Sequence, residues 1–558
     1  MCGIAGFISK NRNYNKEQIV SKMLDKLEHR GPDQKGFDTY HNSTIGMVRL
    51  SIIDTQYHTI PFQDTSKNFA IVYNGEIYNH DEIQNSLKSK YSFSTNSDIE
   101  TAMISYIEDG IKSFDKHNGM YAFAIYNKQK RETIIVRDKV GEKPLYYTIG
   151  KDYFAFASEM KALLEIPNLT PSFNSEAISY KAYEFTVGKE TLFNNIYQLE
   201  PGEYIKVDNI GNYSIHNYWK VWDNLIEVPD NENQIIKDLS ELVEDSILLR
   251  TKNVAHQYSA FISGGVDSSL IAAIAKPDFL YTAHYPYSDF DELEYAKLVA
   301  KQINKELIIV SPTKEDFLRT RDKIAYHLDT PCTWTSFTLW MLVEKAKKDG
   351  VKVVMSGEGA DEMFAGYHRY HLLHHDEKIY NLEAMKQYSY LIGKYHGSAS
   401  SRYAKLVNRY ENPYDEKVNR YLEQTIGKYS NKIGDDIVHF MGLNDFYSTM
   451  QVLLQMSDRI NMAHSIENRS PFLDYRLVQY AFSLNSKYKI KNGITKWALK
   501  EVSKKFIPLE IANRIDKRGF SAPINRWFEF DKNGRYNRSA YKNMVFNDWT
   551  KSFGIRNV

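Results

Sequence analysis

The second residue of the chain is a cysteine, and its position could make it a catalytic nucleophile. Removal of Met1 would leave a thiol and a free α-amine on the same residue. Such an amine has an ordinary pKa of about 7.7–8.0, so at neutral pH it can act as the base that takes the proton from the thiol. An ordinary buried thiol is the alternative, and Cys2 alone does not decide between the two.

A glycine turn in the middle of the chain has the residues expected around a phosphate. Between Phe261 and Ser269 a short apolar strand leads into Gly264 and Gly265, and two serines stand where a helix should begin. Glycines let the backbone approach an anion closely, and N–H groups and hydroxyls at a helix N-terminus then face it. The turn lacks the lysine of the kinase and GTPase phosphate loop, and it resembles the loop of enzymes that cleave ATP between its α and β phosphates. A tight turn that only caps a helix is the alternative.

A second glycine turn, residues 356–362, follows an apolar strand at 351–355 and carries three acidic residues. Ligands of open α/β sheets bind at such carboxyl ends of strands. Asp267 and Asp361 could jointly hold a Mg²⁺ that bridges ATP phosphates, because this ion prefers carboxylate and phosphate oxygens. Ordinary surface acidity is the alternative.

The composition excludes several classes of partner. Among 558 residues, 71 basic and 70 acidic side chains give a net charge of +1, so the charge does not favour nucleic acid or an anionic membrane as a partner. No apolar run approaches the roughly 20 residues of a membrane helix. Two cysteines cannot form a disulfide framework, and no secretory signal is recognised, so we expect a cytoplasmic protein.

The first 200 or so residues are expected to form mainly strands, with helices near Lys16–Leu27 and Ser97–Asp109. The expected strands are Ile45–Leu50, Phe69–Tyr73, Tyr121–Tyr126, Thr133–Val136, Leu145–Thr148 and Tyr153–Phe156. Asn74-Gly75 is expected to be a turn between two of them. Later strands alternate with helices, which predicts a parallel sheet covered by helices. We expect one domain at 1–205, a linker at 206–230 and a second domain at 231–558.

Taken together, the motifs resemble those of the glutamine-hydrolysing asparagine synthetase family over about residues 1–530. In the first half the resemblance rests on Met1–Gly6, His29–Asp33, Arg49–Asp54, Asn74–Asn79 and Arg137-Asp138. In the second half it rests on the two glycine turns, Asp458-Arg459, Met462–Glu467, Arg469, Pro471–Asp474, Gly493–Lys496 and Lys517–Phe520. The resemblance implies an α/β protein in which an αββα N-terminal-nucleophile sandwich is joined to a parallel-sheet ATP-pyrophosphatase domain with added helices.

For the first domain, the resemblance implies a glutaminase. Cys2 would attack the glutamine amide, and Asn74 and Gly75 would form the oxyanion hole. The implied glutamine-binding residues are Arg49, Leu50, Ser51, Ile52, Ile53, Glu76 and Asp98. Taken singly, Asn74-Gly75 is also a hairpin signal and Asp98 a common acid in a first helical turn.

For the second domain, the resemblance implies that ATP activates a carboxylate as an acyl-adenylate. The implied ATP-binding residues are Ile262, Ser263, Gly264, Gly265, Asp267, Ser268, Ser269, Tyr285, Ser356 and Gly357. Glu358 would be the base for the attacking ammonia, Lys496 would neutralise the departing pyrophosphate, and Asp267 with Asp361 would hold Mg²⁺. Tyr285 and Pro286 depart from the family pattern, which normally has a small aliphatic residue and a glycine there.

The leading functional hypothesis is a ligase that makes asparagine from aspartate, ATP and glutamine. The alternative keeps both half-reactions but amidates another acceptor, such as a sugar uronate or a peptide or antibiotic precursor carboxylate. A binding or regulatory protein without activity is a third hypothesis, disfavoured by the presence of Cys2, Asn74, Asp267, Glu358, Asp361 and Lys496. The resemblance also suggests a homodimer.

Overall fold

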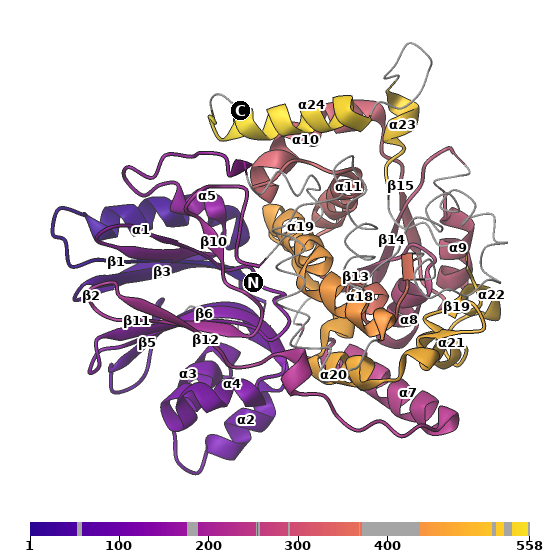
Figure 1. Ribbon diagram of the computed structural model, residues 1–558, viewed down its shortest axis with the longest axis horizontal. Coiled ribbons are helices and arrows are strands. Elements are labelled where there is room, and N and C mark those ends of the chain that lie inside the picture. Colours follow the sequence, from indigo (N-terminus) through magenta and orange to yellow (C-terminus); the bar gives the residue numbers. More distant parts are fainter. Residues whose placement is uncertain are drawn as a thin grey trace.

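The computed structural model describes residues 1–52, 59–175, 188–252, 254, 257–287, 291–367, 369–370, 436–515, 521–528 and 538–555. Two antiparallel six-stranded sheets stack in the N-terminal half, and a parallel five-stranded sheet forms the centre of the C-terminal half (Figure 1). The predicted fold class, α/β with an αββα sandwich and a parallel-sheet domain, is confirmed. Among the described residues, no helix has the length and apolar character needed to cross a membrane.

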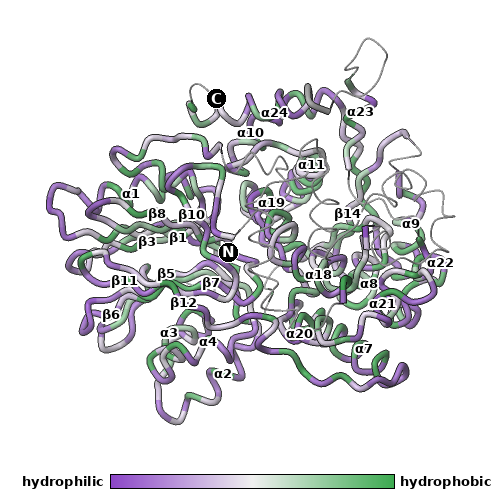
Figure 2. The backbone as a smooth tube through the Cα atoms, viewed as in Figure 1, coloured by the Kyte–Doolittle hydropathy of each residue, from purple (hydrophilic) through white to green (hydrophobic). Residues whose placement is uncertain are grey.

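The first sheet has the order β10-β8-β9-β1-β3-β2, and the second has the order β12-β11-β7-β6-β5-β4. The first contains β1 (Cys2–Ile8), β2 (Gln34–Tyr40), β3 (Ser43–Arg49), β8 (Tyr146–Ile149), β9 (Phe154–Ala157) and β10 (Tyr197–Gln198). The second contains β4 (Phe62–Gln63), β5 (Phe69–Ile77), β6 (Gly119–Asn127), β7 (Glu132–Arg137), β11 (Glu203–Val207) and β12 (Tyr213–Asn217). Figure 2 shows hydrophobic residues along these strands and hydrophilic ones in the outer loops, as expected for two sheets that share a core.

Helices cover the outer faces of both sheets (Figure 1). Those beside the first sheet are α1 (Lys16–Asp25) and α5 (Met160–Leu163), and those beside the second are α2 (His80–Leu87), α3 (Asp98–Asp109) and α4 (Ser113–Lys116). Helix α1 begins where the Asn15 side chain accepts a hydrogen bond from the backbone N–H of Gln18 at 3.1 Å. Its buried residues recur at helical spacing: Ile19, Val20, Met23 and Leu24.

Asn74-Gly75 is not a turn, contrary to the expectation from sequence. Both residues lie inside β5, where Gly75 pairs with Tyr121 of β6. A Cβ on Gly75 would come within 2.3 Å of the carbonyl oxygen of Met120, so glycine is required by the close approach of the two strands. The asparagine-glycine pair is a local turn signal, and the pairing of β5 with β6 overrides it.

The parallel sheet has the order β15-β14-β13-β16-β17. Its strands are β13 (Tyr258–Phe261), β14 (Phe279–Ala283), β15 (Leu307–Val310), β16 (Val353–Met355) and β17 (Glu467–Arg469). Strand β14 follows β13 in the chain and pairs with one edge of it, and the later strand β16 pairs with the other edge of β13. The order of the strands therefore reverses at β13. Ligands of open sheets bind at such a point of reversal, and both glycine turns follow β13 and β16 there.

The other helices and short elements surround this sheet. The helices are α7 (Glu232–Leu249), α8 (Val266–Ala275), α9 (Leu293–Gln302), α10 (Lys314–Leu328), α11 (Trp334–Lys348), α12 (Ala360–Met363), α18 (Ile437–Tyr447), α19 (Thr449–Ala463), α20 (Tyr475–Ser483), α21 (Trp497–Ser503), α22 (Leu509–Ala512), α23 (Ile524–Trp527) and α24 (Arg538–Ser552). A two-stranded ribbon is formed by β18 (Ile490–Lys491) and β19 (Ile494–Thr495). The 3-10 turns are Glu28–Arg30, Gly110–Lys112, Val221–Asp223, Pro471–Leu473 and Ser486–Tyr488.

Two buried histidines, His117 and His439, and two half-buried ones, His327 and His464, predict that the protein loses stability in mild acid. Burial lowers the pKa of His117 to about 3, of His327 to about 2, and of His439 and His464 to about 4. Because the folded pKa lies below the unfolded value of about 6.5, the unfolded chain binds these protons first, and stability falls as pH drops below about 6.5. Each histidine held neutral at pH 5 should cost about 1–2 kcal/mol of unfolding free energy.

Thermal unfolding at pH 7 and pH 5 measures this effect. His464→Gln, which cannot gain a charge, should show a smaller difference between the two pH values than the parent. His216→Gln, at an exposed site, is the matched control and should behave as the parent. A parent protein that is equally stable at both pH values would contradict the prediction.

Candidate active sites

Cys2 begins β1 at the boundary between the two halves of the molecule, opposite Arg49 of β3. The residue is 7% exposed. Its backbone N–H donates to the Asn74 Oδ1 at 3.0 Å, and its carbonyl oxygen accepts from the Arg30 Nε at 3.0 Å. Both peptide groups beside the thiol are therefore held by side chains from elsewhere in the fold.

Asn74 supplies a donor that the described residues leave unused. Its side chain is 0% exposed, and its Nδ2 has no hydrogen-bond partner among the described residues. A buried donor without a partner costs about 1–3 kcal/mol, so native proteins rarely contain one without a reason. An amide N–H beside a thiol is what an oxyanion hole requires.

Asn74→Ala tests this donor. The rate of glutamate release from glutamine should fall by about 10²–10³-fold, because an anion on the substrate oxygen would lose one hydrogen bond. Pyrophosphate release with ammonium chloride as nitrogen source should stay near the parent level, which also shows that the variant is folded. Glutamate release at the parent rate would exclude Asn74 from the oxyanion hole.

Two of the residues predicted to bind glutamine are neighbours: Glu76 lies in β5, and Asp98 begins α3 next to that strand. Asp98 accepts hydrogen bonds from the Tyr73 hydroxyl at 2.6 Å and from the Ile77 backbone N–H at 3.0 Å. Burial and the neighbouring Asp98 raise the pKa of Glu76 well above its usual value, and Arg469, 3.7 Å from Glu76, opposes the rise. Two neighbouring buried carboxyl groups form a favourable place for an ammonium group.

The remaining predicted glutamine residues lie at the end of β3, which is Arg49, and just after it. Arg49 donates to the Gln34 Oε1 at 2.8 Å, and the Ser51 backbone N–H donates to Asp33 at 2.8 Å. Leu50 and Ile52 are buried in an apolar cluster that joins the two halves of the molecule. That cluster contains Met1, Leu50, Ile52, Tyr78, Met120, Leu249, Val353 and Met462. Ile53 lies outside the described residues.

Met1 directly precedes β1, the strand that begins at Cys2. Its α-amino group forms a buried ion pair with Glu467 of β17 at 3.2 Å, and its side chain packs in the apolar cluster described above. While Met1 is present, the nitrogen of Cys2 is a peptide N–H and cannot act as a base.

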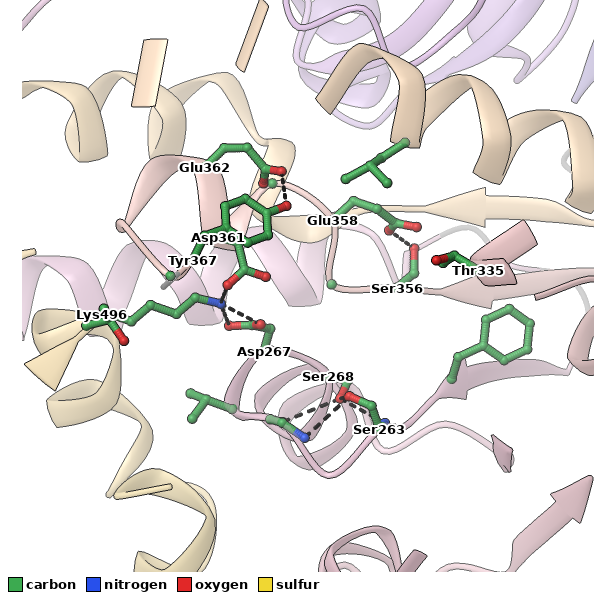
Figure 3. A pocket seen from close by; sticks show the side chains of 18 of the residues that line it. Ser263, Asp267, Ser268, Thr335, Ser356, Glu358, Asp361, Glu362, Tyr367 and Lys496 are labelled. Atoms are coloured by element: carbon green, nitrogen blue, oxygen red, sulfur yellow. Dashed lines mark hydrogen bonds and ion pairs between the residues drawn. The ribbon is translucent and has the colours of Figure 1, made fainter. Parts of the chain in front are cut away.

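The second site is a cavity of about 460 Å³ at the ends of β13 and β16 (Figure 3). The Lys496 Nζ lies 2.7 Å from both carboxylate oxygens of Asp267 and 2.7 Å from the Asp361 Oδ1. Both aspartates therefore point to one place. Gly264 (φ 67°) and Gly359 (φ 92°) have left-handed conformations that turn the backbone around it.

Residues of both glycine turns line this cavity. The predicted residues that do so are Ser263, Gly265, Asp267, Ser268, Ser356, Gly357, Glu358, Asp361 and Lys496. Glu358 accepts hydrogen bonds from the hydroxyls of Ser356 and Ser470, the latter at 3.1 Å. Ile262, Gly264, Ser269 and Tyr285 lie outside the lining; the Tyr285 hydroxyl is 2.7 Å from the Thr338 hydroxyl and its ring contacts Trp527.

Several lining residues were missed by the sequence analysis. Glu362 accepts a hydrogen bond from the Tyr367 hydroxyl at 2.5 Å, and burial, helped by Asp361, raises its pKa to about 7. Leu453 and Met456 reach the cavity from α19. The sequence offered a signal for Glu362, because this residue ends the acidic turn. It offered none for Leu453 and Met456, because apolar residues on a helix are the same types that form an ordinary core.

The two aspartates provide oxygen ligands suited to Mg²⁺, and the lysine ammonium between them shows that the place accepts a cation. No group of three or more potential metal-ligating side chains occurs in the part of the chain that the structure describes. A Mg²⁺ held here would complete its coordination with phosphate oxygens and water, as this ion usually does.

Comparison with known proteins agrees with this arrangement of two sites. A family model for a glutamine amidotransferase domain matches residues 1–219, and one for asparagine synthase matches residues 238–544. The chain belongs to the asparagine synthase family. Asparagine synthetase (glutamine-hydrolyzing) 1 of Bacillus subtilis is 29% identical over 96% of this chain and 89% of its own length.

Two further similarities extend the comparison. Amidase chry2 of Gibberella zeae is 25% identical over 94% of this chain and 90% of its own length. A solved glutamine phosphoribosylpyrophosphate amidotransferase from B. subtilis, complexed with ADP and GMP, is 16% identical with a TM-score of 0.30, covering 65% of this chain and 77% of its own. This asparagine synthase family member is a glutamine-dependent, ATP-using amidoligase.

Proposed function

We propose that the enzyme makes asparagine from aspartate, with glutamine as nitrogen donor and ATP cleaved to AMP and pyrophosphate. The observation that carries the proposal is the pairing of two centres in one chain. One is Cys2 beside the unused donor of Asn74, and the other is Lys496 between Asp267 and Asp361. We also propose a glutaminase unit, a linker and a synthetase unit at 231–558. The glutaminase unit extends beyond the expected boundary at 205, because β12 (Tyr213–Asn217) pairs with β11 in its second sheet, and the linker is shorter than the expected 206–230.

In the glutaminase reaction, the sulfur of Cys2 attacks the amide carbon after Met1 has been removed, and the freed α-amine takes the thiol proton. Asn74 Nδ2 and the Gly75 N–H stabilise the oxyanion, ammonia leaves, and water hydrolyses the thioester to glutamate. Glu76 and Asp98 receive the α-ammonium group of glutamine. Arg49 receives its α-carboxylate, with Leu50, Ser51 and Ile52 forming the adjoining wall.

In the synthetase reaction, the acceptor carboxylate attacks the α-phosphate of ATP and pyrophosphate leaves. Ser263, Gly265 and Ser268 contact the phosphates, and Ser356 and Gly357 lie beside the nucleotide. Ile262, Gly264 and Ser269 shape the first glycine turn from behind this lining. Lys496 neutralises charge on the departing pyrophosphate, and Asp267 and Asp361 hold Mg²⁺, which neutralises phosphate charge when bound. Glu358 takes a proton from ammonia as it attacks the adenylate and releases AMP.

A different acceptor is the second candidate, and the lining of the cavity favours it. Its walls include Phe261, Leu339, Leu453 and Met456. The cationic side chains in the lining already have protein partners. Lys496 pairs with the two aspartates, and Lys500 donates to the Arg514 carbonyl oxygen at 2.7 Å. Arg514 pairs with the Glu292 carboxylate at 2.6 Å. An acceptor with a larger apolar part and one carboxylate fits such walls better than aspartate does.

A screen of acceptors separates the two candidates. Pyrophosphate release is measured with ATP, Mg²⁺ and ammonium chloride, and aspartate is compared with a sugar uronate and with carboxylates of apolar peptides. Stimulation by aspartate, with asparagine as product, supports the proposal. A rate that ignores aspartate and rises with another carboxylate establishes the alternative acceptor.

A further inference from the structure

We propose that Asp458, on helix α19 of the synthetase half, is a positioning residue for the glutaminase nucleophile, and that α19 reports the state of the nucleotide cavity to Cys2. The inference rests on the proposed role of Cys2. It adds a specific connection between the two centres, made of side chains whose contacts can be removed one at a time.

The first link is a buried guanidinium that holds Cys2. The Arg30 Nε donates to the Cys2 carbonyl oxygen at 3.0 Å, while its Nη1 and Nη2 donate to the two carboxylate oxygens of Asp458 at 2.7 and 3.1 Å. Arg30 is 0% exposed. A two-point contact of this kind fixes the plane of the guanidinium, so a carboxylate of the synthetase half sets where the group that holds Cys2 lies.

The second link runs from Asp458 back to the cavity. The Ser457 hydroxyl accepts a hydrogen bond from the Asn468 Nδ2 at 3.0 Å, and the Asn468 Oδ1 is 2.7 Å from the Ser356 hydroxyl. Ser356 also bonds Glu358, and both line the nucleotide cavity. Leu453 and Met456, on the same helix, form part of the cavity wall. A ligand that moves the Ser356–Glu358 pair, or that moves Leu453 and Met456, therefore acts on the helix that carries Asp458.

The charges around this connection keep it ionic at neutral pH. Burial tends to raise the pKa of Asp458, but Arg30 and Lys143 outweigh it and hold the pKa below its usual value. The Glu159 Oε1 also lies 2.8 Å from the Arg30 Nη1, so Arg30 pairs with both Asp458 and Glu159. The same oxygen lies 3.1 Å from the Arg459 Nη1 of α19. A purely structural ion pair between the two halves is the competing explanation, and the variants must separate it from positioning.

Asp458→Asn in the full-length enzyme tests the positioning role. The kcat for glutamate release should fall about tenfold while the KM for glutamine changes less than twofold, and ammonia-dependent pyrophosphate release should persist. Asp329→Asn is the matched control, because Asp329 makes buried ion pairs to Lys161 at 2.8 Å and Arg459 at 3.4 Å, and none of its contacts involves Arg30. Equal losses of glutaminase activity in both variants would show a structural role only and overturn the proposal.

Loss of the Asp458 charge leaves Arg30 with Glu159 alone and could destabilise the fold, so a double variant, Arg30→Met with Asp458→Leu, removes both charges together. Parent glutaminase activity in the double variant would overturn the proposal, and a persistent loss beside intact ammonia-dependent synthesis supports it. Ser457→Ala breaks only the second link. Its glutaminase should keep the parent rate without ATP but lose the change in rate that ATP and acceptor produce in the parent.

A parent glutaminase that is indifferent to ATP and acceptor would overturn the reporting role of α19. Failure of the proposed function itself gives a different result. In that case Cys2→Ala retains glutaminase activity, whatever the behaviour of the Asp458 variants.

Discussion

Cys2→Ala is expected to lower glutamate release from glutamine by at least about 10³-fold, because the variant has no atom that can form the thioester. Ammonia-dependent pyrophosphate release should continue, since the cavity between β13 and β16 contains no part of Cys2. The measurement is glutamate formation from glutamine alone, followed by pyrophosphate formation with ammonium chloride. Intact mass of the parent should show that Met1 has been removed.

The chain offers a matched control in its other cysteine. Cys332 is buried between α10 and α11, where burial raises the pKa of its thiol to about 12. Cys332→Ala should therefore leave glutamate release unchanged. Glutaminase activity that survives in Cys2→Ala but disappears in Cys332→Ala would reverse the assignment of the nucleophile.

Lys496→Met is expected to lower pyrophosphate release by about 10³-fold in the presence of either nitrogen donor. Methionine keeps the unbranched apolar part of the side chain but lacks the ammonium that lies 2.7 Å from Asp267 and Asp361. Negative charge then accumulates where pyrophosphate must depart, and a preorganised cation in such a site contributes several kcal/mol to the reaction. Glutamate release from glutamine alone should remain near the parent value.

Lys504→Met, at an exposed position just after α21, is the control and should retain parent activity; Lys504 pairs there with Glu501 at 2.6 Å. The nucleotide products identify the chemistry at the same time. AMP and pyrophosphate agree with adenylation of the acceptor, whereas ADP and phosphate would refute it. Parent activity in Lys496→Met would remove this residue from the reaction.

Local patterns predicted much of the fold because the physical cause was itself local. Helix α1 begins at Lys16 as expected, since Asn15 caps it and its apolar residues recur at helical spacing. The same reasoning failed at Asn74-Gly75. A turn preference of two residues cannot report that β6 passes within 2.3 Å of the missing Cβ. Tyr285 was likewise assigned to the nucleotide from its position in a motif, and the fold surrounds it with core residues instead.

By itself, the sequence determined which chemistry is available: a cysteine at position 2, two glycine turns with acids after buried strands, and an almost neutral charge. Only the tertiary structure decided which of these groups meet. Lys496 reaches Asp267 across 229 residues of chain, and Asp458 reaches Arg30 across 428. No periodic pattern in the sequence predicts contacts between residues so far apart in the chain, because the pairing arises when the sheets and helices pack. It depends on buried charges finding partners once water is excluded.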